Sequence, residues 1–144
     1  MRKYCAYQER CRSDVWTKLY RLDCPKEEVE EIIDQMEYEG YLDEGRFANS
    51  YTRGHFAIKG WGRNKIQNGL RSKRIPEDLI LKALKGIDAS EYYNKLVDVA
   101  SRKALRVDLT VWDQKQKFKA WLLGRGYEYD LIDDAIEDIL AGNV

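Results

Sequence analysis

Apolar side chains recur every three or four positions along most of the chain, which is the period of an amphipathic helix. The segment between Pro25 and Gly40 shows this clearly, with Val29, Ile33 and Met36 on one face. Proline at the start and glycine at the end are typical helix boundaries. No segment alternates apolar and polar residues over a strand length, so the pattern predicts helices and no sheet.

About nine helices are expected, and their boundaries are marked by capping and breaking residues. The first should run from about Lys3 to Arg12, and Pro76 should begin the sixth. Gly60 and Gly62 favour a turn in which another backbone approaches closely. Side chains able to cap a helix N-terminus stand at four other expected starts: Ser13, Asp43, Ser90 and the pair Thr110-x-x-Asp113.

An internal repeat appears when Cys24, Ile75 and Tyr127 are set in register, at spacings of 51 and 52 residues. Four apolar positions then match in all three copies: Val15, Ile66 and Phe118; Leu19, Leu70 and Leu122; Val29, Ile80 and Ile132; Ile33, Leu84 and Ile136. Units of this size gain stability by packing on their neighbours. The sequence therefore predicts an all-α fold of three tandem three-helix repeats, at residues 1–42, 43–87 and 88–144. We expect an elongated, curved, solenoid-like body in which the first helix is short.

Composition narrows the class of protein. The chain is 44% apolar and 35% charged, with two prolines, so it can bury a core and has a large charged surface. Three cysteines without a Cys-x-x-Cys pair favour a reduced, cytoplasmic protein. The polar N-terminus does not resemble a signal peptide, and no apolar run is long enough for a membrane span.

Residues typical of catalysis are scarce. His55 is the only histidine, and three cysteines without close spacing do not suggest a zinc site. Gly60-x-Gly62 lacks the preceding strand of a nucleotide-binding loop. Acidic clusters such as Asp133-Asp134 fall on polar helix faces. We therefore expect no enzyme activity, no cofactor and no metal.

The formal net charge is zero, but charge is unevenly distributed. Residues 46–85 carry a net charge of +8, whereas residues 1–45 carry −5 and residues 86–144 carry −3. A basic centre between acidic ends creates a local field that attracts anions. The helix bearing Ile66 and Leu70 turns Lys65 and Arg71 outward, and Arg63 stands at its start, where free N–H groups also favour anions.

Ten cations are the predicted binding residues. We expect the surface that they form to lack anions. Lys115 and Lys117 are included because they occupy the repeat positions of Arg63 and Lys65. Trp61 is interpreted as a packing residue. The predicted binding residues are Arg46, Arg53, Lys59, Arg63, Lys65, Arg71, Lys73, Arg74, Lys115 and Lys117.

Three segments together resemble the central motif of the RecX family, whose members regulate the bacterial RecA recombinase. They are Gly40-Tyr41-Leu42-Asp43-Glu44-Gly45-Arg46-Phe47-Ala48, Lys59-Gly60-Trp61-Gly62-Arg63-Asn64-Lys65-Ile66, and Leu70-Arg71-Ser72-Lys73-Arg74-Ile75. The family often has an acidic residue at the position of Gly45 and a proline at that of Arg63. The resemblance implies a monomer that lies along the groove of the RecA filament on single-stranded DNA. It implies inhibition of filament extension, strand exchange and ATP hydrolysis.

Two other functions stay open. A +8 segment on three-helix units also suits a protein that binds DNA phosphates directly through the basic central repeat. The protein could instead be a helical scaffold for a partner outside recombination. The basic surface could meet either RecA or DNA, and the sequence does not distinguish them.

Overall fold

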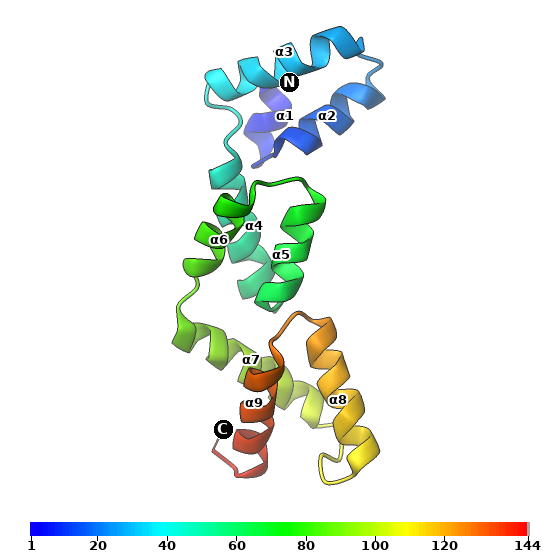
Figure 1. Cartoon of the computed structure of the whole chain (residues 1–144), viewed down its shortest axis with the longest axis vertical. Coiled ribbons are helices and arrows are strands. Elements are labelled where there is room, and N and C mark those ends of the chain that lie inside the picture. Colours follow the sequence, from blue (N-terminus) through cyan, green and yellow to red (C-terminus); the bar gives the residue numbers. More distant parts are fainter. Residues whose placement is uncertain (144) are drawn as a thin grey trace.

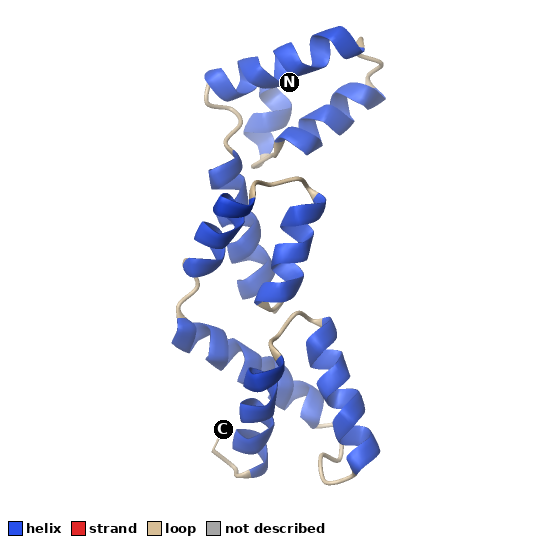
Figure 2. Cartoon of the chain, in the orientation of Figure 1, coloured by secondary structure: helices blue, strands red, loops and turns tan. Residues whose placement is uncertain are grey.

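The structure, a computed structural model, describes residues 1–143, which form nine helices and no strand (Figure 2). Three groups of three helices are stacked along one long axis, with the chain termini in opposite end groups (Figure 1). The helices are α1 (Arg2–Tyr7), α2 (Arg12–Arg21), α3 (Lys26–Tyr38), α4 (Glu44–Ala57), α5 (Arg63–Ser72), α6 (Glu77–Lys85), α7 (Ala89–Ala104), α8 (Trp112–Gly124) and α9 (Tyr129–Leu140). The predicted all-α fold of three tandem three-helix repeats is confirmed. None of the helices in residues 1–143 combines the length and the apolar character that a bilayer crossing requires.

Of the four predicted N-cap side chains, one caps its helix in the structure. Asp43 caps α4 as predicted, since its carboxylate accepts the Arg46 amide at 3.0 Å. Ser13 as a cap is wrong, as is a first helix that reaches position 12. The Cys11 amide donates to Asp14 at 3.2 Å, and this places Cys11 at the N-cap of α2.

Two further predicted caps are wrong for a similar reason. Asp88, not Ser90, caps α7, because its carboxylate accepts the Glu91 amide at 3.0 Å. Thr110 donates through both its amide and its hydroxyl to Asp108, so it is held in the preceding loop. The N-cap of α8 is instead Val111, one residue later. At α2 and α7 a carboxylate, and not the predicted serine hydroxyl, accepts an amide hydrogen bond at the helix start.

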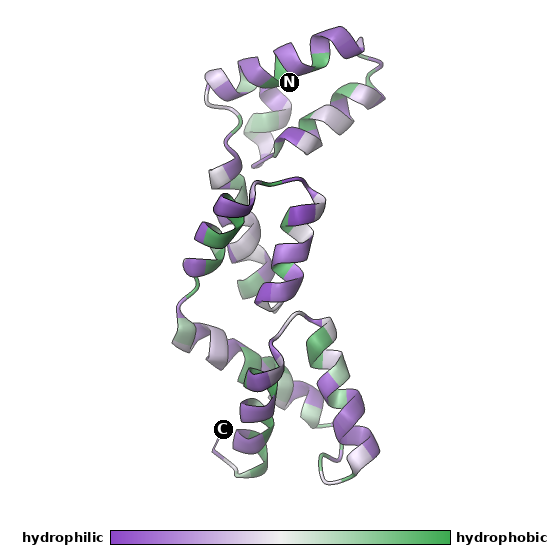
Figure 3. Ribbon diagram, viewed as in Figure 1, coloured by the Kyte–Doolittle hydropathy of each residue, from purple (hydrophilic) through white to green (hydrophobic). Residues whose placement is uncertain are grey.

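The apolar positions of the repeat form the core. Eleven of the twelve matched residues are buried, and Leu84 is partly buried. Figure 3 shows apolar stretches on the helix faces that turn toward neighbouring helices. The repeat predicted from sequence therefore corresponds to core packing in each unit.

Buried residues form two clusters rather than three. One cluster consists of residues from α1–α3 and from the loop that follows α3, and it includes Val15, Ile33 and Leu42. The other extends over α4–α9 and includes Ile66, Tyr92 and Ile136; the first unit contributes only Cys11 to it. The second and third units therefore share a core, whereas the first unit has its own.

Backbone contacts join the second and third units. The Gly62 amide donates to the Arg125 carbonyl at 2.8 Å, and the Asn64 amide donates to the Gly126 carbonyl at 2.9 Å. A Cβ atom at Gly62 would lie 2.5 Å from the Tyr127 amide nitrogen and closer still to the Gly126 carbonyl group. The close backbone approach predicted for the glycine turn thus occurs, and its partner is another turn of the same chain.

The Gly62→Ala variant tests this contact. We expect it to lower the free energy of unfolding by about 2–3 kcal/mol, because the new methyl group forces the two turns apart. Gly54→Ala is the matched control: Gly54 lies inside α4 with open space around it, so alanine should stabilise by about 0.5–1 kcal/mol. Urea unfolding followed by circular dichroism measures both. Equal effects of the two substitutions would contradict the proposed role of the contact.

Tyr127 makes the junction sensitive to alkaline pH. Its side chain is fully buried and its hydroxyl donates to the Gly60 carbonyl at 2.7 Å. Burial raises the pKa of Tyr127 to about 12, whereas tyrosine in an unfolded chain titrates near pH ~10. The contribution of this group to stability is therefore complete below about pH 10 and is lost as the pH rises toward about 12.

We expect the free energy of unfolding to fall above about pH 10, by up to about 1.4 kcal/mol per pH unit for this one group. Urea unfolding at a series of alkaline pH values measures the slope. Tyr127→Phe removes the titrating hydroxyl and should make the slope shallower. An unchanged slope in that variant would show that Tyr127 does not carry the effect.

Candidate functional site: unpaired cations of the central unit

Four of the ten predicted binding cations are paired with carboxylates. The pairs are Arg46 with Glu9 at 2.9 Å, Arg63 with Glu128 at 2.7 Å, Arg71 with Glu77 at 2.6 Å and Lys73 with Asp14 at 2.8 Å. Three of these carboxylates come from the acidic flanks of the sequence. The expectation of a surface without anions is wrong at these four positions: distant segments supply three of the carboxylates, and Glu77 lies only six residues from Arg71.

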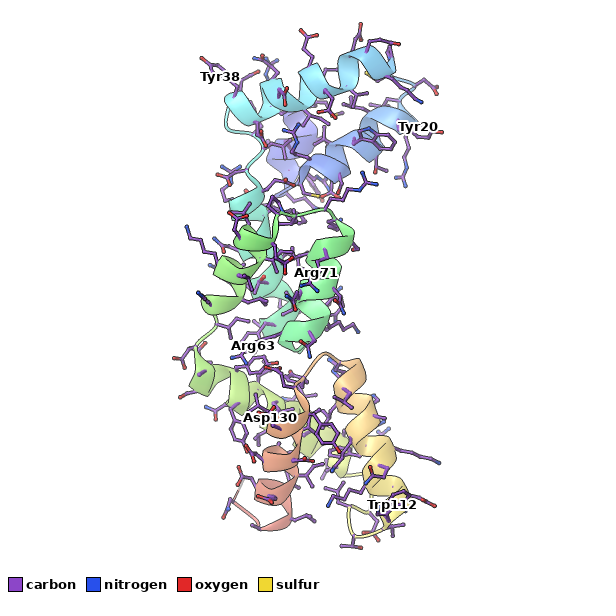
Figure 4. The ribbon with its side chains drawn as sticks, viewed as in Figure 1. Tyr20, Tyr38, Arg63, Arg71, Trp112 and Asp130 are labelled. Carbon is purple, nitrogen blue, oxygen red and sulfur yellow. The ribbon has the colours of Figure 1, made fainter. Side chains whose placement is uncertain are left out.

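Arg63 is part of the junction between the second and third units (Figure 4). Its guanidinium lies 3.7 Å from the centroid of the Tyr92 ring, in addition to its ion pair with Glu128. Its backbone amide donates to the Tyr92 hydroxyl at 2.9 Å, and that hydroxyl donates to Glu128. The predicted anion site at the start of α5 is therefore wrong, because amides there already bind groups of this chain.

Lys73 lies at the junction between the first and second units. Burial lowers its pKa, but the hydrogen bond that it donates to Asp14 and the attraction of that carboxylate together outweigh burial, and the net shift is upward. The pKa of Asp14 is lowered in turn, since hydrogen bonds from Lys73 and the Cys11 amide outweigh burial. Both groups are therefore charged at neutral pH. The Ser13 hydroxyl also donates to the Lys73 carbonyl at 3.0 Å, so this lysine holds two units together.

Six predicted cations make no ion pair with a carboxylate of residues 1–143: Arg53, Lys59, Lys65, Arg74, Lys115 and Lys117. Two of these, Lys59 and Lys65, lie beside Trp61, with their ammonium groups 5.6 and 4.4 Å from the centroid of its ring. Arg74 lines a separate cleft of about 740 Å³ between the first and second units, beside Trp16.

Aromatic rings continue from Trp61 along α4. The His55 ring lies 4.4 Å from Trp61 and stacks on Tyr51 at 3.8 Å. Burial lowers the pKa of His55, and Lys59 and Lys65 lower it further, while its hydrogen bond to the Tyr51 carbonyl opposes them. His55 is therefore neutral at pH 7 and adds no charge. Ile58, 86% exposed, lines the neighbouring groove of about 340 Å³.

We call Tyr51, His55, Lys59, Trp61 and Lys65 the central basic face. It combines two unpaired ammonium groups with aromatic surface, which suits a phosphate or carboxylate partner. Trp61 is half-buried against its neighbours, consistent with its interpretation as a packing residue. Within the part of the chain that the structure describes, neither a hydrogen bond nor an ion pair connects Arg53, Lys115 or Lys117 to this face.

A second group of cations lies at the end of α7 and was not among the predicted binding residues. Arg102, Lys103 and Arg106 stand close to Arg125 and to Trp121 of α8. Three cations within five residues were a visible signal. The negative net charge of residues 86–144 concealed this local cluster of cations.

Comparison with known proteins shows what the chain is similar to. Family models match it twice, as the second three-helix domain of RecX over residues 43–84 and as the third over residues 90–136. The two ranges span more than half of the chain. The crystal structure of RecX from Lactobacillus salivarius superposes with a TM-score of 0.81 at 28% identity, covering 94% of this chain and 89% of that one.

Curated relatives give the same result. The regulatory protein RecX of Clostridium botulinum is 28% identical over 80% of this chain, and that of Prosthecochloris aestuarii is 23% identical over 95%. The chain spans 55% of the length of the first relative and 89% of the second.

Two substitutions separate cations that hold the units together from cations that are free. Arg63→Met should lower the free energy of unfolding by about 1–2 kcal/mol, because it leaves Glu128 half-buried without its partner. Arg53→Met removes the same charge from an exposed, unpaired position and should change stability by less than about 0.5 kcal/mol. Thermal or urea unfolding provides the comparison. Similar losses in both variants would mean that the Arg63 contacts do not stabilise the junction.

Proposed function

This chain belongs to the RecX family, and on that premise we propose that it regulates the RecA recombinase. The protein binds as a monomer along the groove of the RecA filament on single-stranded DNA. There it limits filament extension, strand exchange and ATP hydrolysis, in the cytoplasm and without catalysis of its own.

One observation indicates which residues we propose as the binding site. Lys59 and Lys65 remain unpaired beside Trp61, in a region where Arg46, Arg63, Arg71 and Lys73 are neutralised by carboxylates. Cations that already form ion pairs within the protein gain little from a binding partner. An unpaired ammonium group can still form an ion pair with an anionic group of that partner. The central basic face is therefore the part of the ten-residue set that supports binding best.

The shape of the molecule supports a filament partner. Its three units follow one another along a single axis (Figure 1), and the second and third share a continuous core. An elongated body can contact successive subunits of a helical polymer, and contacts that repeat along a filament reinforce one another. A rigid body lying in a groove would also obstruct changes of filament conformation that accompany ATP hydrolysis.

Direct binding to DNA is the alternative, and the same two lysines favour it because they suit phosphates. The acidic flanks oppose it, since most of the 25 carboxylates of the chain lie there and repel a polyanion. The salt dependence of DNA binding distinguishes a direct DNA binder from a protein that binds the RecA filament. Affinity for naked DNA should fall steeply with salt concentration if phosphate contacts dominate.

The function is tested by ATP hydrolysis of RecA on single-stranded DNA, with this protein added from substoichiometric to equimolar amounts. We expect suppression of hydrolysis together with shorter or fewer filaments in electron micrographs. Unchanged hydrolysis and unchanged filament length, with a folded helical sample, would contradict the proposal.

The paired variant Lys59→Glu with Lys65→Glu tests the site. Reversal of both charges should weaken suppression by about tenfold or more, because two attractive contacts become repulsive. Arg21→Glu with Lys26→Glu is the control, as it makes the same change of net charge at exposed positions of the first unit. Circular dichroism verifies the fold of each variant. Equal weakening by both pairs would point to net charge rather than to the central basic face.

A further inference from the structure

A groove between α7 and α8 combines positive charge with apolar surface. Its volume is about 390 Å³, and it is lined by Val99, Arg102, Lys103, Leu105, Arg106, Trp121 and Arg125. Four of these side chains are cationic and three are apolar. No carboxylate of residues 1–143 is among the lining residues.

Two of the four cations are explained by the stability of α7 itself. Arg102 and Lys103 occupy the last turn of α7, where cations interact favourably with the helix dipole. Arg102 also pairs with Asp98 one turn earlier at 3.3 Å, an exposed contact of small energetic value. Helix stability therefore explains these two residues but not the others.

Leu105 is the residue that helix stability does not explain. It follows α7 directly, and its side chain is 87% exposed. Val99 and Trp121 beside it are only partly buried against the shared core. Arg106, also exposed, makes no ion pair within the described residues. A groove in which Leu105 adjoins Val99 and Trp121 and whose rim is cationic presents contiguous apolar and charged surface that an interface can cover.

The Trp121 ring helps to identify the partner. The ammonium group of Lys103 lies 5.0 Å from the ring centroid, and the guanidinium of Arg125 lies 5.2 Å from it. Both cations compete with any base that would stack on this ring. A phosphate backbone would moreover leave Leu105 uncovered. Carboxylates interspersed with aliphatic side chains match both the charge and the apolar surface of the groove.

We propose that the groove between α7 and α8 is a docking site for an acidic peptide segment that carries aliphatic residues. Its carboxylates pair with Lys103, Arg106 and Arg125, and an aliphatic side chain covers Leu105. The groove adjoins the central basic face, because Arg125 donates a hydrogen bond to the Lys59 carbonyl. The docking site does not depend on the proposed function and can exist whether or not RecA is the partner.

Fluorescence anisotropy tests the proposal directly on the full-length protein. The probe is a short labelled peptide in which glutamates flank two leucines. Two control probes replace its glutamates by glutamine or its leucines by serine, and a labelled oligothymidylate represents nucleic acid. We expect saturable binding of the first peptide and at least about tenfold weaker binding of the other three probes.

Three variants locate the binding. Arg106→Glu should weaken affinity for the acidic peptide by about tenfold, and Leu105→Ser should weaken it several-fold. Arg21→Glu, with the same charge reversal in the first unit, should have no effect. All three residues are exposed, and circular dichroism checks that the variants are folded.

Several results would overturn the proposal: no binding of the acidic peptide up to about 1 mM, equal loss in Arg21→Glu, or tighter binding of the oligothymidylate at the same groove. The last result would assign the groove to nucleic acid. Suppression of RecA by the unmodified protein is measured separately, so failure of the groove and failure of the proposed function are distinguishable.

Discussion

The contact between two glycine turns determines how the second and third units pack on each other. Gly62 and Gly126 bring the backbones of the second and third units into direct hydrogen bonding, which any Cβ atom at either position would prevent. Three-helix units of this size bury little apolar surface alone. The contact lets α4–α9 share one core, and this core fixes the spacing of the two basic regions that flank the junction.

The distribution of charge in space differs from its distribution along the chain. The acidic first unit supplies Glu9 and Asp14, and the third unit supplies Glu128, to cations of the central unit. These pairs hold the junctions together and remove part of the basic surface. What remains available to a partner is smaller and better defined than the local charge of +8 suggests. Lys59 and Lys65 stand out because neighbouring cations are neutralised, and the end of α7 stands out because several unpaired cations gather there.

Helix number, repeat register and core could be predicted from the sequence because they depend on periodic apolar positions and on glycine and proline. The register of Leu19, Leu70 and Leu122 illustrates this, since all three are buried. Helix starts were less predictable, because the competition between Asp88 and Ser90 is decided by local geometry. The pairing of Arg63 with Glu128 could not be predicted, since 65 residues separate them and only the fold brings them together. The groove at Leu105 was missed because regional net charge concealed a local cluster.

Photo-crosslinking tests most directly the claim that the central basic face meets the RecA filament. A photo-reactive amino acid placed at position 59, with position 26 of the first unit as reference, would be activated on filaments assembled on single-stranded DNA. Mass spectrometry would identify the attached partner. We expect efficient crosslinks from position 59 to RecA or to the DNA within the filament, and weaker crosslinks from position 26. Co-sedimentation with filaments without crosslinks from position 59 would contradict it.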